Sequence, residues 1–377
     1  MADIKTNLRE LSVAATIKLL TNNVKFSFDE LCDLDYFLKV INEAITNRIT
    51  SDMICNCEKF NHELCEIIRN GYKLGCEIYS RNEFAVDDKS EIVWKGYDTQ
   101  KDDPVDLEIG KYKFSLKEDS FILENMGLYK LLNCFTGSTY KKRHIFKDYA
   151  NSEYEKWFSV TWQEMIRIIK SQNCFWRLVN KDKGKTATIK ISNDSVELTF
   201  EKGSNVKKCC LPVSCSLSYF EKKTNSKIRE EVFAKFINNL LSDNSNYTIA
   251  KRECAKVATC NLAKELTENL NYNEGLLRFL RVHNFEYYYA KTTVNGISIY
   301  RVPSVSDFKN EIVIDSIQPS VPNSQANILT TIRNKKTEKT LILRNECRFS
   351  HGQFNGTPEA KMYYENGGSL LTIYESI

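Results

Sequence analysis

Residues 102–120, DDPVDLEIGKYKFSLKEDS, alternate between apolar and polar side chains on both sides of a glycine–lysine pair. Residues 105–109 alternate apolar and acidic side chains, and residues 112–117 alternate apolar side chains with lysine and serine. Alternation with a period of two predicts β-strands, and the pair Gly110 and Lys111 predicts the turn between them. We therefore expect a β-hairpin with one apolar face and one polar face.

The polar face of this hairpin carries Asp106 on the first strand and Ser115 and Lys117 on the second. Cross-strand neighbours lie close together, so Asp106 and Lys117 can point to one spot. Hydrolysis of a phosphodiester uses a divalent cation and a group that positions or deprotonates the attacking water. Mg²⁺ prefers carboxylate oxygens as ligands. The alternative interpretation is a solvated hairpin whose lysine only covers a sheet edge.

The segment DPVDLEIGKYKFSLK resembles the active-site hairpin of the PD-(D/E)xK nuclease superfamily, and more narrowly that of type II restriction endonucleases. In that family an aspartate closes the motif of the first strand, and a D/E-x-K or S-x-K tripeptide lies on the second. Pro104 and Asp106 match the first half with one extra residue between them, and Lys117 matches the catalytic lysine. Ser115 departs from the majority pattern, which has a second carboxylate there.

The resemblance implies Mg²⁺ as cofactor and a further acidic ligand beside Asp106. In members with serine in place of the second carboxylate, a glutamate of the following helix contacts the metal, which here implies Glu124, with Glu118 and Glu108 as rivals. The family also often draws an acid from a helix before the hairpin. Glu77 and Glu66 are the candidates there, and Glu77 is preferred for its nearness to the core.

Composition is that of an ordinary globular protein, with 377 residues, 27% charged residues and a net charge of +4. No apolar run is long enough to span a bilayer, and the N-terminus lacks the apolar core of a secretory signal, so we expect a cytoplasmic protein without a membrane partner. The thirteen cysteines are then buried thiols, since their spacing matches no common zinc module.

Periodicity predicts an α/β or α+β fold with a mixed sheet. The resemblance implies a restriction-endonuclease-like core, with a central mixed β-sheet flanked by helices, plus an additional DNA-recognition region. We divide the chain near residue 175. Residues 1–175 hold the helical N-terminal part and the catalytic core, and residues 176–377 form a mixed α/β region with DNA-recognition elements. Within them we expect helices over 7–80, 121–135, 153–173, 227–243 and 252–270, and strands over 92–116, 175–219 and beyond 287.

Two segments have the residue types that contact DNA. The basic segment YKKRHIFK offers Lys141, Lys142 and Arg143 to backbone phosphates. Residues 341–368, LILRNECRFSHGQFNGTPEAKMYYENGG, combine arginine and amide side chains, which pair with guanine and adenine, with two phenylalanines and flexible glycines. An exposed polar loop is the alternative interpretation of this segment. Its candidate DNA-binding residues are Arg344, Asn345, Arg348, His351, Gln353 and Asn355.

The resulting functional hypothesis is a Mg²⁺-dependent type II restriction endonuclease that hydrolyses double-stranded DNA at a specific short sequence. The resemblance implies a homodimer on a palindromic site and a DNA methyltransferase in the same system. Two alternatives stay open: a non-catalytic nucleic-acid-binding protein, which the serine at position 115 favours, and a structure-specific repair nuclease or junction resolvase of the same fold.

Overall fold

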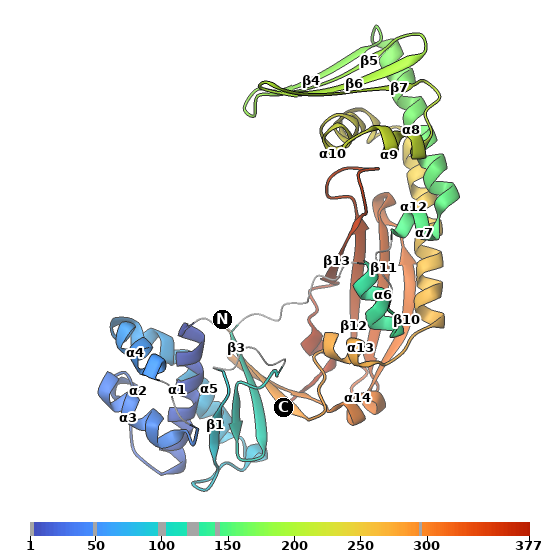
Figure 1. Cartoon of the computed structure of the whole chain (residues 1–377). Helices are drawn as coiled ribbons and strands as arrows, with labels where there is room; N and C mark the ends of the chain where they lie inside the picture. The colour runs from blue at the N-terminus through green and yellow to red at the C-terminus, as the bar shows by residue number, and fades with distance from the viewer. Residues whose placement is uncertain (1–3, 48–50, 97–102, 119–127, 140–143, 294–295) are drawn as a thin grey trace.

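The computed structural model describes residues 4–47, 51–96, 103–118, 128–139, 144–293 and 296–377. Figure 1 shows a curved molecule with α1–α5 and a first sheet at one end, and the sheet of β4–β7 at the other. The long helices α8 and α12 run between these ends beside a third sheet. None of the helices that the structure describes is long and apolar enough to cross a membrane.

Helix α1 packs closely against α5 at the N-terminal end of the chain. A Cβ atom on Gly71 of α5 would lie 1.7 Å from the Ser12 Oγ atom of α1, and one on Gly75 would lie 2.8 Å from the Cβ atom of Thr16. Glycine at both positions therefore lets the two helix backbones approach each other. The elements here are α1 (Ile4–Thr21), α2 (Phe28–Leu31), α3 (Leu34–Ala44), α4 (Ser51–Lys59), η1 (Asn61–Glu63), α5 (Leu64–Ser80) and η2 (Asn82–Phe84).

The first sheet is mixed and contains the predicted hairpin. Its strand order is β1-β2-β3-β8-β9-β14; β3 and β8 run parallel, and the other neighbours run antiparallel. Gly110, with φ of +56°, lies in the turn between β2 and β3, so the prediction of a hairpin is confirmed. The strands are β1 (Ile92–Trp94), β2 (Leu107–Ile109), β3 (Tyr112–Glu118), β8 (Tyr287–Thr293), β9 (Gly296–Val302) and β14 (Glu375–Ser376).

The chain between β3 and β8 forms a long excursion with its own antiparallel sheet in the order β4-β5-β6-β7. The predicted strands are confirmed over residues 175–212, as is the hairpin through residues 192–194, but residues 217–219 begin helix α9. Its elements are α6 (Leu128–Thr136), α7 (Ile145–Tyr149), α8 (Asn151–Ser171), β4 (Phe175–Asn180), β5 (Lys185–Ile191), β6 (Ser195–Lys202), β7 (Asn205–Pro212), α9 (Leu217–Lys223), α10 (Ser226–Ile228), η3 (Arg229–Phe233), α11 (Ala234–Phe236), η4 (Ile237–Leu241), α12 (Ser245–Glu268) and α13 (Glu274–Phe279).

A third sheet, in the order β10-β11-β12-β13, follows the first one and is antiparallel throughout. Figure 1 shows it beside α12, with α6 and α13 near its lower part. The fold is therefore mixed α/β with a mixed sheet and flanking helices, as predicted. The elements are α14 (Val305–Glu311), β10 (Ile312–Ser320), η5 (Pro322–Ser324), β11 (Ala326–Asn334), β12 (Thr340–Arg348), β13 (Glu359–Tyr364) and η6 (Leu370–Ile373).

The buried apolar residues form two clusters. The first runs from α1 to β3 and includes Ala290 of β8, and the second begins at α6 and includes Tyr287 and Tyr289 of the same strand. Alternate residues of β8 thus serve both clusters, because successive side chains of a strand point to opposite faces. The division expected near residue 175 lies at the start of β4, inside the second cluster.

Residues 226–241 form one helical run in which α-helical and π-helical turns alternate, where the sequence predicts a plain amphipathic helix. Its apolar residues recur as pairs every four residues: 232–233, 236–237 and 240–241. A period of four drifts by about 40° per repeat around an α-helix, which has 3.6 residues per turn. The wider π turns offset this drift and keep the apolar pairs on one buried face.

Candidate active site

Asp106, Ser115 and Lys117 meet at one end of the first sheet. The Lys117 Nζ atom donates to Asp106 Oδ2 at 2.7 Å, the backbone N–H of Leu116 donates to the same oxygen at 2.7 Å, and Ser115 Oγ lies 3.5 Å from it. The Asp106 side chain is 15% exposed, and that of Lys117 is 36% exposed. The carboxylate is therefore held in place by β3 and still borders on solvent.

The backbone of Asp106 is fixed on both sides. Its N–H donates to the carbonyl oxygen of Phe114 at 2.8 Å, and its own carbonyl oxygen accepts from the N–H of Lys95 at 2.9 Å. Asp106 thus continues the pairing of β2 with its two neighbours beyond the strand itself. The apolar residue that follows, Leu107, is fully buried and sets the register that points Asp106 toward Lys117.

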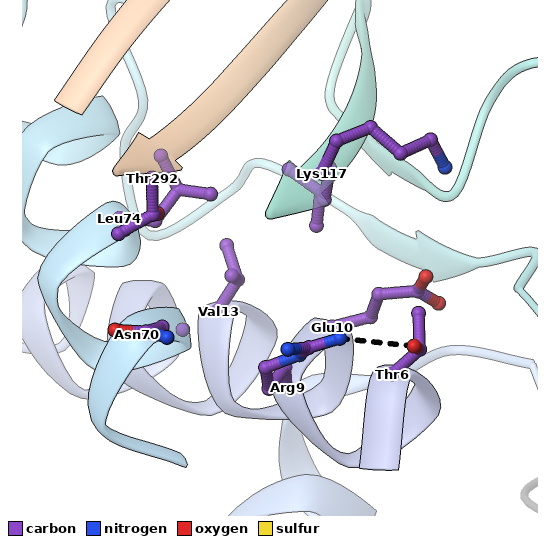
Figure 2. Close-up of a pocket in the computed structure, with 10 residues that line it drawn as sticks. Thr6, Arg9, Glu10, Val13, Asn70, Leu74, Lys117 and Thr292 are labelled. Atoms are coloured by element: carbon purple, nitrogen blue, oxygen red, sulfur yellow. Dashed lines mark hydrogen bonds between the residues drawn. The ribbon is translucent and has the colours of Figure 1, made fainter. Parts of the chain in front are cut away.

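A second carboxylate, Glu10 of α1, lies beside this group. Glu10 is only 3% exposed, and the indole Nε1–H of Trp94 on β1 donates to its Oε2 atom at 2.9 Å. Burial, together with the negative charge of Asp106, raises the pKa of Glu10 to about 8, although the Trp94 hydrogen bond and the positive charge of Lys117 act in the opposite direction. In Figure 2 the Glu10 carboxylate and the Lys117 ammonium extend to the same side of the view.

Close packing surrounds the Glu10 carboxylate. A Cβ atom on Gly96, two residues after β1, would lie 1.9 Å from Glu10 Oε2, so only glycine lets the chain pass this near. On the helix side a cavity of about 150 Å³ adjoins Glu10 and Lys117 and extends between α1 and α5 (Figure 2). The site thus combines two carboxylates and one ammonium with a small solvent-accessible space.

Two neighbouring carboxylates are ligands of the type that a divalent cation takes in proteins. Burial and the charge of Asp106 outweigh the positive charges of Lys117 and Arg9 at Glu10, and a cation bound to both carboxylates would add further positive charge there. Mg²⁺ is commonly bound by one or two carboxylates, with waters and phosphate oxygens completing its ligands. Among the side chains that the structure describes, no three from His, Cys, Asp and Glu gather as a metal site.

The acids expected as further ligands have other surroundings or lie outside the described part of the chain. Glu77 forms an ion pair with Arg81 at 2.7 Å on the last turns of α5, and Glu108 pairs with Lys95 at 2.6 Å. Glu124 and the side chain of Glu118 lie outside the described residues. The acid that the structure brings to Asp106 from a helix before the hairpin is Glu10.

The sequence contains one signal for Glu10. Glu10 is the only acidic residue in the segment that forms α1, and it stands directly before the uncharged run of residues 11–17, all of which the structure buries. A charged residue in such a helix needs a partner or a function. Trp94 has no comparable signal, because only the assembled sheet places its N–H at Glu10.

The candidate DNA-binding residues of the C-terminal part lie on β12 of the third sheet and in the loop after it, whereas this site lies at the first sheet (Figure 1). Arg344 forms ion pairs with Glu346 and Glu365, and Asn345 is buried in the second cluster. Lys141, Lys142 and Arg143 lie outside the described residues.

The end of β12 and the loop after it hold the remaining candidates. Arg348 is the last residue of β12, and His351 is exposed, with its Nδ1 atom 3.5 Å from Glu230 Oε1. Gln353 has a buried Oε1 atom with no hydrogen-bond partner in the described structure, and Asn355 donates to the carbonyl oxygen of His351 at 2.9 Å. These four residues thus lie near the helical run 226–241 of the excursion, and none of them contacts Asp106 in the described structure.

Comparisons with protein-family models, with curated proteins and with solved structures found no match to this chain.

Proposed function

We propose that this chain is a Mg²⁺-dependent endonuclease that hydrolyses phosphodiester bonds in double-stranded DNA at a specific short sequence, as type II restriction endonucleases do. The observation that carries the proposal is the meeting of Asp106, Lys117 and Glu10 at one end of a mixed sheet. The hairpin that resembles the PD-(D/E)xK pattern supplies the first two. Glu10 is an acid from a helix before the hairpin, which the resemblance implies.

Each residue has a separate task in this proposal. Asp106 and Glu10 would hold Mg²⁺, and Mg²⁺ when bound polarises the phosphate and lowers the pKa of a bound water. Lys117 orients the attacking water or takes its proton, and its charge stabilises the charge that develops on the phosphate. The N–H of Leu116 and the Nζ of Lys117 keep Asp106 in one orientation before substrate arrives. The Trp94 indole does the same for Glu10.

The test is the cleavage of supercoiled plasmid DNA with Mg²⁺ by the wild-type protein and by three variants. Asp106→Asn and Glu10→Gln keep the size of each side chain but remove its charge, and Lys117→Met removes the ammonium. We expect each variant to cut at least about 100-fold more slowly, since a positioned acid–base or charge-stabilising group contributes that much or more. Lys113→Ala, on the same strand but bound to Glu108, is the matched control and should cut normally.

The outcomes separate the proposal from its alternatives. Discrete fragments with ends at one sequence support site-specific cleavage, whereas cutting only at branched or damaged DNA indicates a repair nuclease or resolvase. Wild-type protein that binds DNA but never cuts it, at any Mg²⁺ concentration, indicates a non-catalytic binding protein. If Asp106→Asn and Lys117→Met both cut as fast as wild type, the hairpin is not the active site.

A further inference from the structure

A groove of about 800 Å³ lies at the end of the molecule away from Asp106, between the sheet of β4–β7, the helical run 226–241 and the loop after β12 (Figure 1). We call it the polar groove. Thirteen of the nineteen residues that line it are polar or charged. Sites for small organic ligands are mostly apolar, so this lining suits a hydrated, charged partner better than a small apolar one.

The helical wall of the polar groove presents polar residues in a straight row. Glu230, Glu231, Lys235, Asn238 and Asn239 line the groove, at intervals close to four residues. In a regular α-helix residues eight apart would be rotated by about 80° from each other. The π turns at η3 and η4 reduce this rotation, so that Asn238 and Asn239 face the same space as Glu230. Such π turns are frequent at functional sites.

The sheet wall brings lysines to the other side of the groove. Lys181 and Lys183 are exposed in the turn between β4 and β5, and neither forms an ion pair with a described residue. Lys185 is neutralised by Glu231 of the helical wall. Lys202, the cross-strand partner of Lys185, adds an exposed positive charge on the same face of the sheet. Asp182 lies between Lys181 and Lys183 and also lines the groove, so the free end of this sheet carries a net positive charge with one carboxylate among the lysines.

The third wall comes from the C-terminal segment. Gly352, with φ of +91°, packs so tightly on the helical run that a Cβ atom would lie 2.2 Å from the Cβ of Ala234. This contact places His351 beside Glu230, at 3.5 Å between Nδ1 and Oε1. The C-terminal segment, which lies about 120 residues after the helical run and about 170 residues after the β4–β5 turn, thus closes one polar space with them.

We propose that the polar groove is the surface with which this chain binds and reads duplex DNA, an inference that rests on the function proposed above. Lysine ammoniums neutralise backbone phosphates and supply affinity without sequence information. Asparagine amides pair with adenine and carboxylates accept from the amino group of cytosine, so Asn238, Asn239 and Glu230 supply the groups that distinguish base edges. A carboxylate such as Glu230 in this row repels phosphate and argues for contact with bases there.

Fluorescence anisotropy with a labelled duplex pool of randomised central sequence tests this proposal. The measurement is made in EDTA, so that cleavage does not intervene. For Lys181→Ala with Lys183→Ala we expect weaker binding to every duplex alike, and a slope of log affinity against log salt that is smaller by about 2. For Asn238→Ala with Asn239→Ala we expect a roughly 10- to 100-fold loss of preference for the sequences that wild type selects from the pool.

The control is Lys190→Ala, because Lys190 is exposed on the opposite face of the same sheet, next to buried Ile189. It should bind and select like wild type. If wild type binds selectively and both double variants do the same, the polar groove is not the reading surface, and the proposed function still stands. If wild type binds no duplex in EDTA, this inference fails; if it also cuts no plasmid with Mg²⁺, the proposed function is wrong as well.

Discussion

Glu10 should make the metal-free protein less stable as the pH rises. Burial and the negative charge of Asp106 raise the pKa of Glu10 from 4.5 to about 8 in the folded protein. A raised folded pKa gives stability that is complete below the unfolded pKa and is lost as the pH rises through the folded pKa. Each pH unit in this window costs about 1.4 kcal/mol, so the free energy of unfolding should fall by about 5 kcal/mol between pH 4.5 and pH 8.

The comparison that isolates this effect is wild type against Glu10→Gln. Glutamine keeps the shape of the side chain and an oxygen that accepts from the Trp94 indole, but it cannot ionise. Urea denaturation in EDTA, at several pH values between 4.5 and 8, measures the free energy of unfolding of both proteins. All other titrating groups are common to the two proteins, so the difference between the curves reports Glu10 together with its coupling to Asp106 and Lys117. We expect this difference to change in favour of the glutamine variant as the pH rises.

The same reasoning gives the effect of Mg²⁺. Near pH 8 a cation between Glu10 and Asp106 favours the ionised carboxylate, so added Mg²⁺ should recover much of the stability lost by wild type and little in the glutamine variant. Curves for wild type and Glu10→Gln that run parallel in EDTA would refute the assignment of a buried carboxylate with a raised pKa. A Mg²⁺ response that is equal in both proteins would show that Glu10 does not hold the cation.

Three substitutions near the site and its supporting helices give further expected outcomes. Trp94→Phe leaves a buried oxygen of Glu10 without its donor, which costs about 1–3 kcal/mol. Because the Trp94 hydrogen bond lowers the pKa of Glu10, its removal raises that pKa further, and the loss of stability in the same urea experiment extends to higher pH. Gly96→Ala places a Cβ atom 1.9 Å from Glu10 Oε2, so we expect a higher Mg²⁺ requirement in plasmid cleavage with a loss of about 1–3 kcal/mol in stability. Gly71→Ala improves helix propensity by about 1 kcal/mol, yet its Cβ would lie 1.7 Å from Ser12 Oγ and 2.2 Å from a backbone oxygen of α1. We therefore expect urea denaturation to show a net loss of stability. A gain would show that α1 and α5 can move apart.

Local pattern was sufficient for the hairpin and for most helices. Alternation over 105–117 and the turn at Gly110 predict β2 and β3, and the structure has both. Local pattern could not predict that β8, which begins about 170 residues later, pairs in parallel with β3. The excursion between them has its own sheet and core, and nothing in the sequence near β3 indicates how far away its next neighbour is.

The site shows the same division between local and distant information. Asp106 and Lys117 are eleven residues apart on paired strands, so their contact follows from the hairpin. Glu10 is 96 residues before Asp106 and reaches it only because α1 packs along α5 and under β1. Expected nearness to the core favoured Glu77, but the Glu77 side chain forms an ion pair with Arg81 instead.

The helical run 226–241 joins these two kinds of information. Its period of four is visible in the sequence, since apolar pairs at 232–233 and 236–237 alternate with the groove-lining pairs at 230–231 and 238–239. A four-residue period departs from 3.6, but over three repeats an ordinary amphipathic helix still accommodates it on one half of its surface. The pattern thus predicts an amphipathic helix with a polar side, whereas the π turns are seen only in the structure. The polar row faces the β4–β5 turn and residues 350–352. The sequence of these two segments does not indicate that they contact the helical run.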